Sequence, residues 1–88
     1  MRLNATSVDK DEILVNFNAQ PIAGKQDAVA IFDLSPRGDL REAAANLFAV
    51  MKKADGLSAR CIAFAPIPYE GLGEAINDRL SRAAAPRE

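Results

Sequence analysis

The sequence predicts an α/β fold, a small three-layer domain with a mixed, mostly parallel sheet of about four strands and two main helices. Two segments, residues 28–34 and 60–65, are apolar at nearly every position, as strands are when both faces of a sheet are covered. Between them lies an amphipathic helical pattern long enough to cross over between parallel strands. A chain of 88 residues has room for one domain with a modest core.

The other strands are expected nearer the amino terminus. Residues 12–17 (EILVNF) form an apolar run typical of a strand, and residues 2–6 alternate weakly, which favours a short edge strand. Residues 18–27 contain a proline and a glycine, so we expect a loop there rather than a crossover helix. The two strands that are apolar throughout are therefore assigned to the centre of the sheet.

The first helix is expected over residues 39–55, and both of its ends are marked. Asp39 can cap its start, with Glu42 three residues later as in a capping box. Two lysines lie in the last turn, where they favour the helix dipole, and Gly56 is placed to end the helix. The apolar positions that recur at helical spacing are Leu40, Ala43, Ala44, Leu47, Met51 and Ala54.

The second helix is expected over residues 72–84, with Pro86 limiting it and residues 85–88 frayed. We expect one helix on each face of the sheet, although both could pack on one face. The expected apolar face of this helix consists of Leu72, Ala75, Ile76, Leu80 and Ala83.

The composition narrows the classes of function. Eleven Lys and Arg against twelve Asp and Glu give a net charge of −1, unlike the basic surface of an autonomous nucleic-acid binder. Histidine, the commonest general base and zinc ligand, is absent, so no catalytic or metal residue is assigned. The single Cys61 is interpreted as a core side chain. The sequence shows neither a signal peptide nor an apolar stretch of membrane-spanning length, so we expect a cytoplasmic protein without a membrane partner.

The turn that leads into the second helix is the main candidate for a ligand site. Ligands of open α/β sheets gather beyond the carboxyl ends of the strands, and Gly71 and Gly73 would let backbone amides approach a phosphate. Arg37, in the other strand-to-helix turn, and Arg79 are the candidate cations. Two glycines make neither a Walker loop nor a dinucleotide fingerprint, so turn formation is the simpler interpretation. Arg79 could equally cover apolar surface, pair with a carboxylate or reach a partner.

Several short elements together resemble a known family, the carboxy-terminal domain of the two-domain form of L-threonylcarbamoyl-AMP synthase. The resemblance implies a small Rossmann-like α/β unit. The opening residues 2–6 also look like the start of that domain. The matching elements are Asn46-Leu47-Phe48, Asp55, Gly71-Leu72-Gly73, Asn77-Asp78-Arg79-Leu80 and Arg82-Ala83-Ala84.

The resemblance implies that this chain is part of a larger enzyme. The full enzyme condenses threonine, bicarbonate and ATP into threonylcarbamoyl-adenylate, from which the adenosine next to the anticodon of certain tRNAs is modified to threonylcarbamoyladenosine. Its catalytic centre belongs to an amino-terminal domain that has no counterpart in this sequence. The resemblance therefore assigns no catalytic residue and no cofactor to this domain.

Three functions remain open at this point. The first is a non-catalytic regulatory or docking domain, whose partner is the catalytic domain of the same polypeptide. The second is a small nucleotide- or anion-binding sensor that uses the helix start at Gly71 to Gly73. The third is a free-standing protein that binds a separate catalytic partner. For an exposed contact patch, the candidates are Phe48, Ile67 and Tyr69.

Overall fold

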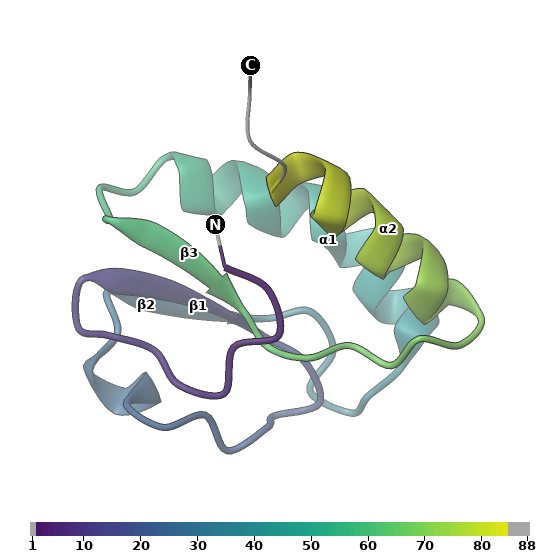
Figure 1. Ribbon diagram of the computed structural model, residues 1–88, viewed down its shortest axis with the longest axis horizontal. Helices are drawn as coiled ribbons and strands as arrows, with labels where there is room; N and C mark the ends of the chain where they lie inside the picture. Colours follow the sequence, from purple (N-terminus) through teal and green to yellow (C-terminus); the bar gives the residue numbers. More distant parts are fainter. Residues whose placement is uncertain (1, 85–88) are drawn as a thin grey trace.

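The computed structural model describes residues 2–84 and confirms an α/β fold with two main helices (Figure 1). The two helices have nearly the expected bounds, while the expectations about Pro86 and residues 85–88 lie outside the described residues. In chain order the elements are β1 (Glu12–Asn16), the 3-10 turn η1 (Lys25–Asp27), β2 (Ala30–Asp33), α1 (Leu40–Asp55), β3 (Cys61–Phe64) and α2 (Leu72–Ala84).

The sheet has three parallel strands in the order β2-β1-β3. Ile13 of the central strand pairs with Ala30 on one side and with Ile62 on the other. All five residues of β1 are buried, whereas β2 is an edge strand with an exposed Ile31. Assigning the segments 28–34 and 60–65 to the centre was therefore wrong. Helix α1 joins two parallel strands, as expected, but it crosses over β1 to do so.

The expected fourth strand, residues 2–6, is reduced to a single bridge between Arg2 and Ala63. The Arg2 N–H donates to the Ile62 carbonyl at 2.9 Å, and the Arg2 carbonyl accepts from Phe64 N–H at 2.8 Å. Asn4 then has a φ of 54°, which takes the backbone out of the extended conformation and breaks the regular ladder, although Ala5 N–H still donates to the Phe64 carbonyl at 2.8 Å. The described sheet is thus wholly parallel rather than mixed.

Both helices pack on the same face of the sheet, beside each other (Figure 1). The opposite face is covered by the amino-terminal segment and by the connection from β1 to β2. That connection contains only the short turn η1, so no helix is available for the second face. The arrangement with one helix on each face is wrong, and the alternative with both on one face is correct. The core between the sheet and the helices consists of Val15, Phe17, Leu34, Ala43, Leu47, Val50, Phe64, Ile67, Ile76 and Leu80.

Helix α1 begins at the expected cap. A side-chain oxygen of Asp39 accepts from the N–H groups of Arg41, at 2.9 Å, and Glu42, at 3.3 Å. These hydrogen bonds lower the pKa of the Asp39 carboxyl, with the bond from Glu42 N–H having the largest effect and the bond from Arg41 N–H the next largest. Glu42 does not return the bond to Asp39. It accepts from the Ser35 hydroxyl, whose oxygen accepts from Asp39 N–H at 2.9 Å, so the capping box closes through Ser35.

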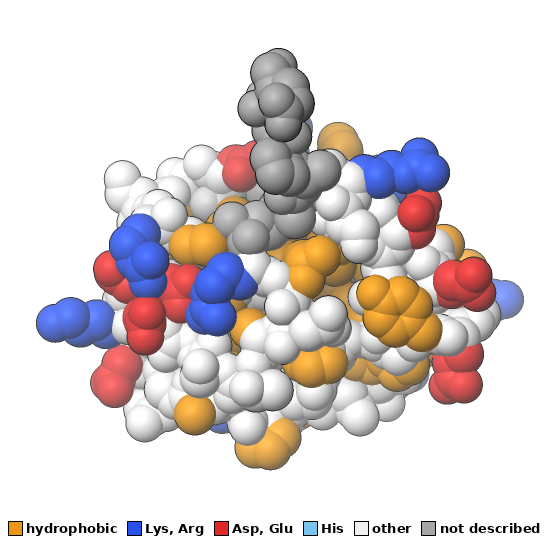
Figure 2. Space-filling model, viewed as in Figure 1, with side chains coloured by type: hydrophobic (Ala, Val, Ile, Leu, Met, Phe, Trp, Pro, Cys, Tyr) orange, Lys and Arg blue, Asp and Glu red, His pale blue; other side chains and the backbone are white. Residues whose placement is uncertain are grey.

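Charged side chains form a network at the amino-terminal ends of the strands, which we call the amino-terminal edge of the sheet. Figure 2 shows acidic and basic side chains grouped together there. Glu12, the first residue of β1, is fully buried and accepts from Arg2 at 2.7 and 3.0 Å and from Asp9 N–H at 2.9 Å. The hydrogen bonds from Arg2 are the main reason why the pKa of Glu12 is lowered to about 2. Arg60 lies 3.9 Å from Glu12 and also binds Asp9 and Asp11, at 2.9 and 2.8 Å.

Candidate functional site

The turn between β3 and α2 contains both glycines of the expected ligand site, and each meets a backbone requirement. Gly71 has a φ of 54° and lies in open space, so it supplies a left-handed turn conformation. A Cβ at Gly73 would lie 1.9 Å from the carbonyl oxygen of Pro68. Only glycine allows the turn to approach the first turn of α2 so closely.

The backbone amides of this turn are engaged within the turn itself. The N–H of Gly73 donates to the Glu70 carbonyl at 2.9 Å, and that of Glu74 donates to the Gly71 carbonyl at 3.2 Å. A phosphate could use these two N–H groups only if the turn opened. Anion binding at Gly71 and Gly73 therefore stays a prediction, and the observed geometry does not favour it.

Asn77 holds the same turn from inside. Its side-chain amide donates to the carbonyl oxygens of Ile67, at 2.8 Å, and Gly73, at 2.9 Å, and the side chain is buried. The Ile67 carbonyl lies outside the helices and strands, so the bond from Asn77 satisfies a buried acceptor that no regular element pairs, while the Gly73 carbonyl lies within α2. Asn77 thus has a structural role in fixing the path from β3 into α2.

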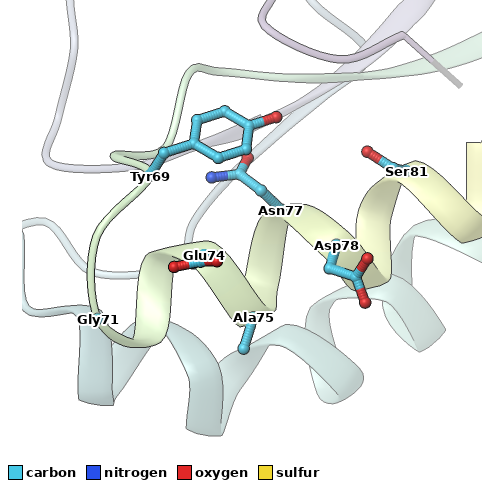
Figure 3. A pocket seen from close by; sticks show the side chains of 7 residues that line it. All are labelled: Tyr69, Gly71, Glu74, Ala75, Asn77, Asp78 and Ser81. Atoms are coloured by element: carbon cyan, nitrogen blue, oxygen red, sulfur yellow. The ribbon is translucent and has the colours of Figure 1, made fainter.

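A shallow hollow lies along α2 next to this turn (Figure 3). Tyr69 and Gly71 lie near the start of the helix, while Asp78 and Ser81 lie toward its other end (Figure 3). Glu74 also lines the hollow, and none of the lining residues is a lysine or an arginine. Asp78 pairs with Arg82, which lies outside the lining, at 3.2 Å, and Glu74 adds a second carboxylate, so this acidic lining does not favour a phosphate.

The two candidate cations lie on other surfaces. Arg37 is exposed and forms ion pairs with Asp39, at 3.2 Å, and Glu42, at 3.6 Å, across the start of α1. Arg79 lines hollows between α1 and α2. The four residues of the expected ligand site are therefore not gathered into one hollow of the described chain.

The carboxyl end of the sheet has a second, uncharged hollow between the loops that follow β1 and β3. The chain leaves β1 toward β2, on one side of it, whereas β3 lies on its other side. Open α/β sheets often bind ligands where the strand order changes direction in this way. Gln20 fills part of the space, donating to the carbonyls of Phe17 and Pro66, each at 2.8 Å. The lining of this hollow offers amides and apolar groups but no charge. It consists of Asn4, Phe17, Asn18, Gln20, Pro66, Ile67, Pro68 and Tyr69.

A groove runs between the outer sides of α1 and α2, and we call it the helix-pair groove. Phe48 stands in it with 71% of its surface exposed. Phe48 and Arg79 line both of its parts. The groove is lined by Ala44, Leu47, Phe48, Leu72, Ala75, Ile76 and Arg79, and it continues along Met51, Lys52, Asp55 and Ala83.

The structure corrects the expected contact patch and the expected helix faces. Phe48 and Tyr69, 71% and 67% exposed, lie on the surface as predicted, but Ile67 is buried in the core. On α2 only Ile76 and Leu80 of the expected apolar face are buried. The other members, together with one from α1, line the helix-pair groove instead: Leu72, Ala75, Ala83 and Ala44. The sequence analysis missed the groove, although Ala44, Phe48 and Lys52 follow one another at helical spacing.

Within residues 2–84 no group of three His, Cys, Asp or Glu side chains is arranged to hold a metal ion. Neither of the two described main helices is long and apolar enough to cross a membrane.

The parallel sheet, the helices on one face and the glycine-bearing turn into α2 define a small open-sheet α/β domain. The family described as threonylcarbamoyl-AMP synthase, C-terminal domain, matches residues 2–85. The chain belongs to that family, which confirms the resemblance and connects the chain with threonylcarbamoyl-AMP synthase and with threonylcarbamoyladenosine formation in tRNA. Comparisons with curated proteins and with solved structures gave no significant match.

Proposed function

We propose that the chain is a non-catalytic regulatory and docking domain of an L-threonylcarbamoyladenylate synthase. The observation that carries this proposal is the family match, which covers residues 2–85 and concerns a carboxy-terminal domain. In this proposal the partner is the catalytic domain of the same enzyme, which acts on ATP, threonine and bicarbonate. In this proposal the chain itself binds no nucleic acid, and the enzyme acts in the cytoplasm.

The chemistry of the chain supports a role in binding rather than in catalysis. The sequence contains no histidine, and the buried carboxylate of Glu12 is held ionised by Arg2 instead of being free to exchange a proton. Two aromatic side chains, Phe48 and Tyr69, are largely exposed. Exposed aromatic residues are typical of surfaces that a partner covers.

The test is an assay of threonylcarbamoyl-adenylate formation from ATP, threonine and bicarbonate, with product identified by mass spectrometry. Three samples are compared: the chain alone, the catalytic domain from the same organism alone, and both together. We expect no product from the chain alone and a change of several-fold in kcat/KM of the catalytic domain, saturating with chain concentration. Product from the chain alone would contradict the non-catalytic role, and an unchanged kcat/KM would contradict regulation.

A further inference from the structure

The helix-pair groove combines an apolar wall with one central arginine. Phe48 exposes 71% of its surface beside Leu72, which is also exposed. Small side chains, Ala44 and Ala75, lie on the two opposing helices. Small residues there leave room for a third helix to pack against both at ordinary interaxial distances.

Arg79 has no carboxylate within 4.0 Å among residues 2–84, although charged neighbours lie on the same helix. Asp78 and Arg82, on either side of it, pair with each other at 3.2 Å instead. A guanidinium is weakly hydrated and binds carboxylates through two parallel hydrogen bonds. Arg79 is thus available to a carboxylate that comes from outside the described chain.

We propose that the helix-pair groove is the docking surface for an amphipathic helix of the catalytic domain, whose apolar face carries a carboxylate opposite Arg79. The apolar side chains of that helix cover Phe48 and Leu72. This inference rests on the proposed function, and it adds the face that docks and the chemistry of the segment that it takes.

Charge favours such a partner over a second copy of this chain. In a twofold contact of groove on groove, Arg79 of each copy would approach its own equivalent. Lys52, on the same groove, would add to the repulsion, which the single Asp55 could only partly offset. An amphipathic helix with a carboxylate on its apolar face can cover the apolar side chains of the groove and also pair with Arg79.

The experiment maps the contact on the whole 88-residue chain labelled with ¹⁵N. The probe is the unlabelled catalytic domain from the same organism, added until the amide shifts stop changing. We expect the largest shifts in α1 and α2 along the helix-pair groove, residues 44–55 and 72–83. Saturable shifts confined to the carboxyl end of the sheet, around Asn18 and Tyr69, would overturn the groove while leaving docking itself intact.

Two pairs of variants separate the groove from other exposed residues. Phe48→Ala is matched with Ile31→Ala on β2, because both remove an exposed apolar side chain and Ile31 lines no described hollow. Arg79→Glu is matched with Arg41→Glu, which reverses an exposed charge on α1 that lines no described hollow. We expect the groove variant of each pair to raise Kd by about 10-fold or more and its control to change Kd by less than about 2-fold. Equal effects within a pair would overturn the proposal.

Salt dependence tests the carboxylate. The Kd of the original chain should rise between 50 and 500 mM NaCl, and that of Arg79→Ala should rise much less. Arg79→Lys should keep the salt dependence with weaker binding, because it keeps the charge but loses the two-pronged hydrogen bond. A salt dependence unchanged in Arg79→Ala would contradict a carboxylate at this position. Absence of any binding to the catalytic domain would overturn the proposed docking function itself.

Discussion

The amino-terminal edge of the sheet and the helix-pair groove use arginine in opposite ways. At the edge, Arg2 and Arg60 are both paired with carboxylates of the same chain. In the groove, Arg79 has no such partner within the described residues and lies beside an exposed Phe48. The arginines at the edge are paired within the described chain, whereas the groove exposes an apolar surface and a positive charge to solvent. The difference separates residues that should determine stability from residues that should determine binding.

The largest effect should come from the carboxylate at the centre of the edge. Glu12→Ala removes a fully buried partner of Arg2 and of Asp9 N–H, and we expect it to lower the free energy of unfolding by about 3 kcal/mol. Urea unfolding measures it. Asp11→Ala, which removes an exposed partner of Arg60, should cost less than about 1 kcal/mol. Similar losses in both variants would show that burial of Glu12 does not matter.

Acid should weaken the edge in a defined range of pH. The pKa of Glu12 falls from an ordinary 4.5 to about 2 in the folded chain, so its stabilisation is present above pH 4.5 and is lost as the pH falls toward 2. Urea midpoints between pH 2 and pH 7 measure this loss. Glu12→Gln should remain folded with a flatter dependence below pH 4.5. Parallel pH curves for the two proteins would contradict the assigned pKa.

Helix α2 allows a sharper version of the same comparison, because its two sides differ. Asn77→Ala leaves the buried carbonyl of Ile67 without its donor, and we expect a loss of about 2 kcal/mol. Its neighbour Asp78 is exposed, so Asp78→Ala should cost about 0.5 kcal/mol or less. Amide exchange should also accelerate in the turn before α2 only for Asn77→Ala. Unchanged exchange there would argue against a role in holding the turn.

The smallest effect on stability is expected in the groove. Phe48→Ala and Arg79→Ala should each change the free energy of unfolding by about 0.5 kcal/mol or less, because both side chains are exposed. Thermal or urea unfolding measures this. A loss of more than about 1 kcal/mol would make the groove part of the core and would remove the contrast with the edge.

The sequence was sufficient for the local elements and insufficient for their assembly. Caps and periodicity gave the bounds of α1 and α2, because these features involve residues a few positions apart. The position of β1 at the centre was missed, since residues 28–34 are equally apolar and only pairing decides which strand has two neighbours. The missing fourth strand depends on the positive φ of Asn4, which weak alternation of apolar residues does not predict.

The candidate site was the least predictable part. Gly73 was expected to approach a phosphate, but its close neighbour is the Pro68 carbonyl, which only the three-dimensional path of the turn reveals. Arg79 was given three possible roles, which were to cover apolar surface, pair with a carboxylate or reach a partner, and it lines the helix-pair groove together with Leu72 and Ile76. The exposure of Leu72 could not be foreseen, because helical spacing shows which residues share a face but not how much of that face the sheet and α1 cover.

The strand order also has a consequence for how the chain acquires its structure. The central strand β1 precedes both of its partners, and β3 follows only after β2 and α1, so Ile13 must pair with Ile62 far along the sequence. Such distant pairings slow folding relative to helical bundles of similar size. During synthesis, one side of β1 therefore stays unpaired until β3 has emerged. In the nascent chain, the unpaired backbone groups of β1 are a site where aggregation could begin.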